Sequence, residues 1–229
     1  MIITHWLSNN YIEVFGAVTG IIFVFLEIRQ TIWLWLVGII TSAVYIWVFF
    51  TSKIYADMSL QVYYLVISCL GWYWWAKGTG HQPSLKLRLA KQGTGQKEEG
   101  VKGMVVKWEK EELEVTRLKP RTGMVLAIVF VLLFIAMWLF LTRLTDSPVP
   151  VRDSFITSLS IIATWMLARK IYEHWYLWIV VNFVSAVLFM TRGLYPTVIL
   201  YVVYGLMSFV GLAAWGKTIK MDLTTSKNE

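Results

Sequence analysis

Residues 123–142 read GMVLAIVFVLLFIAMWLFLT, twenty residues without a charged side chain. The hydrocarbon core of a bilayer is about 30 Å thick and needs roughly 20 apolar residues in an α-helix to cross it. The stretch is therefore predicted to span a membrane. The composition agrees, because 57% of the 229 residues are hydrophobic and 15% are charged, against about 25% charged in an average soluble domain. We expect an all-α integral membrane protein.

Three further apolar stretches lie on each side of residues 123–142, and together they predict seven transmembrane helices. Most of their connections hold only a few polar residues, so successive helices are expected to be antiparallel neighbours. The six flanking spans are Tyr11–Arg29, Thr31–Phe50, Ile54–Ala76, Asp153–Lys170, His174–Thr191 and Leu194–Gly216.

The two flanking groups repeat each other at an offset of 140 residues. Residues 16–77 align with residues 156–217 without a gap and share 16 identities in 62 positions, including the pairs Trp35/Trp175 and Gly71/Gly211. Two three-helix units joined directly would face opposite ways, and one additional helix restores a common orientation. We therefore predict a 3+1+3 arrangement of two parallel repeats, residues 1–76 and 153–217, with residues 123–142 as the inverting linker. Parallel repeats place a solute site between them near the membrane midplane.

Residues 77–122 form a polar insertion rich in Lys and Glu. Two runs in it, residues 85–89 and 112–118, alternate apolar and polar side chains, which is typical of strands with one covered face. We predict a small β-hairpin in this segment.

The distribution of Lys and Arg predicts the orientation of the chain. With the N-terminus outside, 17 of these residues fall on the inner side and 4 on the outer side, which the positive-inside rule favours. Residues 77–122 and the tail 218–229 are then cytoplasmic. Because the basic residues sit in one loop and at helix ends, the net charge of +7 indicates membrane topology and no nucleic-acid partner.

Polar and aromatic side chains in the middle of the spans are the candidate solute contacts. An amide both donates and accepts hydrogen bonds, and aromatic rings stack on planar ligands or hold a cation. The candidates are Gln61, Tyr64, Thr164, Trp175, Trp178, Asn182, Tyr201 and Tyr204.

The carboxylates of the spans, Glu27 among them, lie near span ends, which argues against a mid-membrane proton or sodium relay. This favours facilitated diffusion of a neutral or singly charged solute. Enzyme motifs such as a Walker loop or H-E-x-x-H do not occur in the sequence. We expect no catalysis, no cofactor and no metal.

Two further expectations concern side-chain burial. The single cysteine, Cys69, is expected to be a small buried residue. Tryptophans and tyrosines near span ends are expected to form interfacial belts; they include Trp33, Trp35, Trp72, Trp74, Trp75, Tyr172, Trp175 and Tyr176.

The chain resembles the PnuC family of bacterial nicotinamide riboside transporters and its thiamine-transporting PnuT branch. The resemblance covers residues 11–216 and leaves out the 77–122 insertion. It rests on the following motifs: Gln61-Val-Tyr-Tyr, Gly71-Trp-Tyr-Trp-Trp75, Asp153-Ser154, Met166-Leu-Ala-Arg-Lys170, Glu173-His-Trp-Tyr-Leu-Trp178, Asn182 and Gly193-Leu-Tyr195.

The resemblance implies a bacterial inner-membrane homotrimer that takes up a vitamin by facilitated diffusion, with trapping by a cytoplasmic kinase. It implies ligand contacts from Gln61, Tyr64, Trp178 and Asn182, with Trp175 as a further one. Nicotinamide riboside and thiamine are both planar cations, and the sequence leaves the choice between them open, with nicotinamide riboside as the family's commoner substrate. A sugar transporter of the SWEET type, which shares the 3+1+3 logic, and a membrane-bound receptor or scaffold are competing hypotheses.

Overall fold

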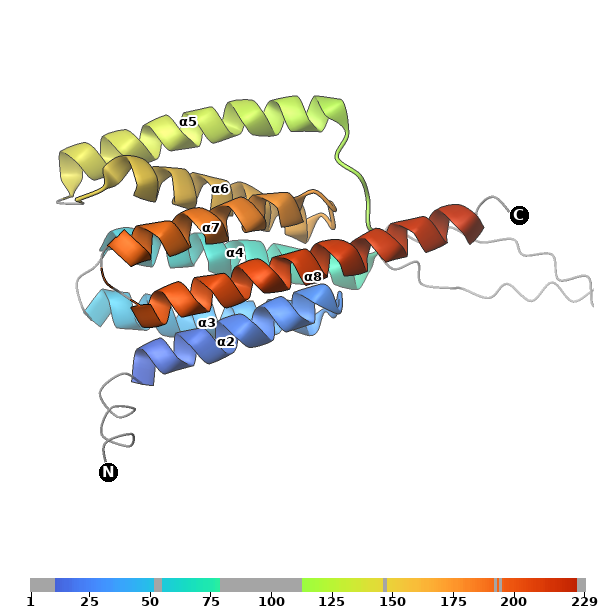
Figure 1. Cartoon of the computed structure of the whole chain (residues 1–229), viewed down its shortest axis with the longest axis horizontal. Coiled ribbons are helices and arrows are strands. Elements are labelled where there is room, and N and C mark those ends of the chain that lie inside the picture. Colours follow the sequence, from blue (N-terminus) through green and yellow to red (C-terminus); the bar gives the residue numbers. More distant parts are fainter. Residues whose placement is uncertain are drawn as a thin grey trace, which may run out of the picture.

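The structure, a computed structural model, describes residues 11–51, 55–78, 113–145, 148–191, 193 and 195–225. Within these ranges it contains seven helices, which match the predicted spans closely (Figure 1). The last helix continues nine residues beyond the predicted end at Gly216. The helices are α2 Tyr11–Ile28, α3 Trp33–Thr51, α4 Tyr55–Lys77, α5 Pro120–Leu144, α6 Pro150–Ala168, α7 His174–Thr191 and α8 Tyr195–Thr225.

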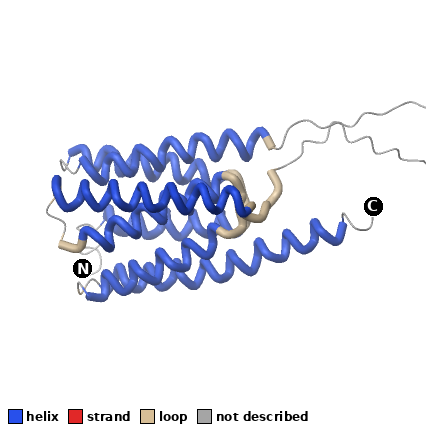
Figure 2. Tube along the Cα trace, turned by 90° about the horizontal axis from the view of Figure 1, so that it is seen from above, coloured by secondary structure: helices blue, strands red, loops and turns tan. Residues whose placement is uncertain are grey.

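Six of the helices form a closed ring. Helix α2 packs on α3, α3 on α4, α4 on α6, α6 on α7, α7 on α8, and α8 returns to α2. Helix α5 lies outside the ring along α6 and has no buried residue (Figure 1). The helices run lengthwise beside one another as a bundle (Figure 2). The centre of the ring is thus enclosed by both groups of three helices.

Four of the described helices are long and apolar enough to cross a membrane by length and composition: Trp33–Thr51, Pro120–Leu144, His174–Thr191 and Thr197–Ile219. Helices α4 and α6 have lower hydropathy, and in α6 the polar residues Ser154, Ser158, Ser160 and Thr164 are buried. The outer surface carries many exposed Val, Ile, Leu and Phe side chains, more than 40% exposed at Phe25, Val66, Leu132 and Phe183. A bilayer, unlike water, solvates such a surface favourably.

The same glycine–tryptophan contact occurs at positions 140 residues apart. A Cβ atom on Gly71 would lie 2.5 Å from ring atoms of Trp35, and one on Gly211 would overlap the ring of Trp175. Each glycine therefore lets an indole ring lie flat against the backbone of the neighbouring helix. Both tryptophans have 0% exposure.

The turns that follow α2 and α6 also correspond. Gln30 has φ 54° and Lys170 has φ 49°, so equivalent positions adopt the left-handed conformation that ends a helix. Helices α5 and α6 each have a proline in the first turn, where its missing N–H costs no intrahelical bond and its fixed φ suits the helix.

The predicted interfacial belt is wrong for three tryptophans and for Tyr172, which is buried as well. Trp35, Trp75 and Trp175 are buried, and Trp35 meets Trp75 edge to face at 5.5 Å between ring centroids. Trp35 and Trp175 pack in the core because the glycines opposite leave room for indole rings. The expectation for Cys69 is also wrong, since this residue is exposed on the outer surface of α4.

The described end of the 77–122 insertion is a short extended segment, residues 113–119, which we name the strap. The Thr116 N–H donates to the Lys170 carbonyl and the Tyr172 N–H donates to the Thr116 carbonyl, both at 2.9 Å. The Leu118 N–H donates to Glu173 Oε2 at 2.7 Å. The second predicted strand is thus extended from residue 113, but it pairs with the turn between α6 and α7. The first predicted strand, residues 85–89, lies outside the described residues.

Candidate functional site

The ring encloses a cavity of about 400 Å³, which falls in the range of small-molecule sites, about 300–1,000 Å³. Each of the six ring helices contributes to its wall. The structure brings together all eight candidate residues predicted from the sequence, since each lines this cavity: Gln61, Tyr64, Thr164, Trp175, Trp178, Asn182, Tyr201 and Tyr204.

Two tryptophans of α7 line the cavity and have hydrogen-bond donors that no described residue accepts. The indole N–H groups of Trp175 and Trp178 are buried and have no partner among the described residues. Buried donors are normally satisfied, so each orphan needs an explanation. One explanation is that a hydrogen-bond acceptor on a ligand in the cavity receives these N–H groups.

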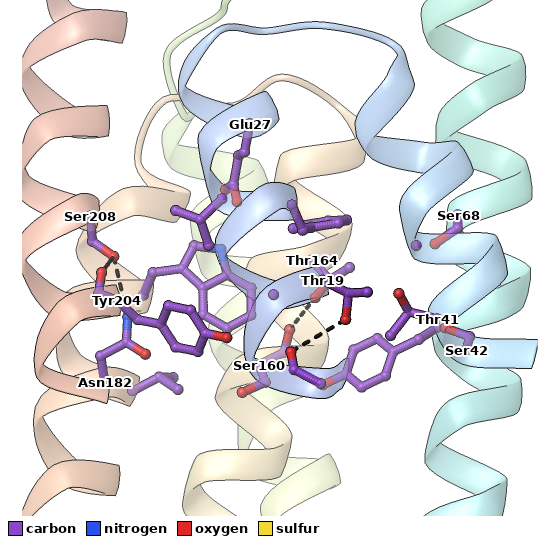
Figure 3. A pocket seen from close by; sticks show the side chains of 18 of the residues that line it. Thr19, Glu27, Thr41, Ser42, Ser68, Ser160, Thr164, Asn182, Tyr204 and Ser208 are labelled. Atoms are coloured by element: carbon purple, nitrogen blue, oxygen red, sulfur yellow. Dashed lines mark hydrogen bonds between the residues drawn. The ribbon is translucent and has the colours of Figure 1, made fainter. Parts of the chain in front are cut away.

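Asn182 is held in place by a chain of hydrogen bonds. Its Nδ2 donates to Ser208 Oγ at 3.2 Å, and the Ser208 hydroxyl donates to the Tyr204 carbonyl at 2.8 Å (Figure 3). Asn182 itself is 6% exposed. This network fixes the amide plane and leaves its oxygen and second N–H available for a ligand.

Other wall residues have their hydroxyl groups engaged or shape the cavity. The Thr164 hydroxyl donates to the Ser160 carbonyl at 2.8 Å (Figure 3), so Thr164 contributes mainly its methyl face. The Tyr204 hydroxyl lies where a Cβ on Gly20 would be. Gly20 thus lets a tyrosine from α8 reach across to α2.

Sequence reasoning missed a buried acid–base pair beside the cavity. Glu27, 2% exposed, lines the cavity, and its Oε1 lies 3.0 Å from Nε2 of His174, which is 0% exposed. In the sequence, Glu27 is a carboxylate near the end of a span, and His174 is one of three scattered histidines. The available signal was topological, because the end of α2 and the start of α7 lie at the same end of an antiparallel bundle. The described residues contain no group of three metal-ligating side chains.

A ring of apolar-surfaced helices around a polar and aromatic cavity is the architecture of a multi-pass membrane transporter. The model of the family described as nicotinamide mononucleotide transporter matches residues 10–217. The chain belongs to this family, and the PnuC-type resemblance is confirmed.

Curated relatives match along most of the chain. The nicotinamide riboside transporter PnuC of Escherichia coli (strain K12) is 24% identical over 208 residues, 90% of this chain and 85% of the relative. The PnuC of Neisseria mucosa is 25% identical over 219 residues, 93% of this chain and 74% of the relative. The riboflavin/roseoflavin transporter RibM of Streptomyces davaonensis is 24% identical over 228 residues, 95% of each chain.

A solved structure supports the fold. The crystal structure of the vitamin B3 transporter PnuC superimposes with a TM-score of 0.66 at 23% identity and covers 96% of this chain and 86% of that chain. The described helices of this protein therefore adopt the PnuC fold.

Proposed function

We propose that this protein carries nicotinamide riboside across the membrane by facilitated diffusion, with the central cavity as its binding site. The observation that carries the proposal is the pairing of Trp178 with Asn182 on one face of α7, inside a cavity of suitable volume. Nicotinamide riboside offers a planar cationic ring and a carboxamide. An aromatic ring and an amide side chain complement those two groups.

The other wall residues have supporting roles in this proposal. Gln61 provides a second amide from α4, and Trp175 provides a buried N–H donor. Tyr64, Tyr201 and Tyr204 supply aromatic walls, and Thr164 adds an apolar edge.

We propose seven membrane spans in a 3+1+3 arrangement, with α5 as the linker between two parallel repeats. The closed ring supports this reading, because the contact of α2 with α8 corresponds to the contact of α6 with α4. The glycine–tryptophan contacts at an offset of 140 residues support it as well.

Orientation, assembly and trapping complete the proposal. The charge distribution supports an inner-membrane protein with its N-terminus outside and C-terminus inside. The family resemblance supports a homotrimer and retention of the solute by a cytoplasmic kinase.

Two further ligands compete with nicotinamide riboside for this cavity. Thiamine is also a planar cation and fits the same chemistry. A flavin is favoured by one observation, the match to RibM over 95% of both chains. The family match makes a SWEET-type sugar carrier or a receptor the weaker hypothesis.

Direct calorimetric titration of purified protein tests the substrate. We expect submillimolar binding of nicotinamide riboside, with thiamine, riboflavin and glucose titrated alongside. Glucose binding without binding of any vitamin would overturn the proposal, and riboflavin binding alone would reassign the substrate.

Uptake into vesicles tests the mode of transport. At equal pH on both sides and without an ion gradient or kinase, uptake is expected to stop at equal concentrations. Accumulation beyond that point would contradict facilitated diffusion. Addition of a riboside kinase and ATP inside the vesicles is expected to restore net uptake.

A further inference from the structure

Glu27 is the one charged residue among the described side chains that line the cavity. Its carboxylate lies at the edge of the cavity, near the turn between α2 and α3 (Figure 3). A carboxylate buried inside a membrane protein is costly and marks a functional group by default. The structure assigns it one ionisable partner, His174.

The geometry of the pair fixes its proton count. His174 Nδ1 lies 2.7 Å from the Ile171 carbonyl oxygen, which can only accept, so Nδ1 carries a proton. At 3.0 Å, Nε2 and Glu27 Oε1 need one proton between them, because two lone pairs would repel. Whichever atom holds that proton, the pair has no net charge.

The contact with His174 uses one of the two carboxyl oxygens of Glu27, Oε1. Glu27 is therefore tied to α7 through one oxygen, while its side chain still forms part of the cavity wall. A ligand in the cavity can meet a carboxyl group that has unused acceptor capacity.

The neighbouring charged groups are engaged elsewhere. The Lys170 ammonium lies 4.4 Å from the Trp75 ring centroid, Arg29 lies over Phe25, Arg169 over Trp74, and Glu173 pairs with Arg117. Helix α8 meets the pair with the Trp215 ring and donates its indole N–H to the Glu27 carbonyl at 3.1 Å. On the cavity side the titratable neighbours are the phenols of Tyr45, Tyr64, Tyr201 and Tyr204.

We propose that Glu27 is the counter-ion for a cationic ligand and that binding of the cation releases the proton shared with His174. This inference deepens the proposed function and rests on it. A cation and a neutral acid–base pair become a cation, a carboxylate and a neutral imidazole, and one proton leaves to water, so charge balances. The carboxylate turns from Nε2 toward the cation in this step, so the lone pairs of Nε2 and Oε1 no longer face each other. A neutral ligand of the same shape leaves the shared proton in place. The site thereby distinguishes pyridinium-type ligands from neutral heteroaromatic ones.

Calorimetry in two buffers of different ionisation enthalpy counts the released protons. The probes are nicotinamide riboside, a cation, and its reduced dihydro form, which has nearly the same outline and no ring charge. For the cation we expect release of close to one proton, and below neutrality an affinity that increases with pH by up to about tenfold per pH unit. For the neutral form we expect no release and no such increase.

Two variants separate the roles of the pair. Glu27→Gln removes the exchangeable proton; proton release should vanish, and the affinity for the cation should fall about tenfold while that for the neutral form stays unchanged. His174→Gln supplies an amide donor to a charged Glu27, so the preference for the cation should remain while its pH dependence disappears. Either variant suffices if the other fails to fold.

Asn182→Ser is the matched control, since it should weaken both ligands alike and keep the proton release. The proposal is overturned if wild-type protein binds the cation without releasing a proton, or if Glu27→Gln still releases one. Wild-type protein that binds neither ligand instead overturns the proposed function, and the role of Glu27 with it.

Discussion

Helices α2–α4 and helices α6–α8 have the same packing but different cavity walls. Gly71 and Gly211 receive Trp35 and Trp175 in the same way. On the cavity wall, position 38 is glycine where position 178 is tryptophan, and position 42 is serine where position 182 is asparagine. The two halves share a frame, and at these two positions the second half carries the larger group.

This difference bears on where the proposed ligand is expected to bind. A planar ligand without twofold symmetry needs one stacking ring and one amide partner, so a symmetric wall would present the same group twice. We expect the ligand to lie against α7 and to meet a smoother wall on α3. The comparison makes four predictions, in decreasing order of expected effect.

The shared frame is tested by adding a methyl group at both glycines. Gly71→Ala and Gly211→Ala should each lower the free energy of unfolding by about 3 kcal/mol, because the new Cβ would overlap an indole ring in a packed core. Thermal unfolding in detergent measures this. Gly205→Ala is the control, since its Cβ would meet its nearest atom at 3.8 Å. Tolerance at one glycine alone would break the equivalence of the halves.

The difference between the walls is tested at position 178. Trp178→Gly recreates the residue found at position 38 and should weaken ligand binding by about 2 kcal/mol, roughly 30-fold, because a stacking surface is lost. Titration calorimetry measures this. Trp138→Ala, on the exposed face of α5, should leave the affinity unchanged. Equal losses from both variants would point to a general effect on folding.

The amide of Asn182 is tested in the same way, by introducing the residue found at the corresponding position of the first half. Asn182→Ser recreates residue 42 and should cost about 1 kcal/mol of binding free energy, roughly fivefold, through loss of a hydrogen bond. Calorimetric titration of the same ligand measures this. Ser42→Ala should have a smaller effect. A larger loss at Ser42 would move the site toward α3.

The smallest effect concerns the strap, which covers the α6–α7 turn. Glu173→Gln weakens the bond from the Leu118 N–H and the contact with Arg117, 3.5 Å away. Because the Arg117 side chain is 63% exposed, the loss of stability should be under about 1 kcal/mol. Hydrogen exchange at Leu118 should speed up. A change in ligand affinity would show that the strap also acts on the cavity.

Much of the fold followed from apolar length and the internal repeat. The predicted spans match the described helices, because a stretch of about 20 apolar residues has few other stable states in lipid. The eight candidate residues line the same cavity because polar side chains of helices that face lipid point toward the centre of the bundle. A closed ring of helices has a single interior.

Burial near helix ends was not predictable in the same way. Trp35 and Trp175 were predicted to be interfacial because their positions in the sequence place them near span ends. The sequence does not show that a glycine on the neighbouring helix makes room for each indole ring. Glu27 and His174 lie 147 residues apart. They are not at corresponding positions of the two repeats, which are offset by 140 residues, so the repeat gave no reason to pair them. The sequence pattern predicted that the strap is extended. Its partner is the turn between α6 and α7, and no sequence pattern marks that turn as a pairing partner.

Helix α8 has 31 residues, about 46 Å at 1.5 Å per residue, and it projects beyond the rest of the bundle (Figure 1). A bilayer core accounts for about 30 Å of that length. The remainder is a stiff helical extension that holds Thr225 beyond the hydrocarbon core. A fluorophore at Thr225 would therefore stand at a nearly constant height above one leaflet. Quenchers confined to either side of a vesicle could then report how each inserted molecule is oriented.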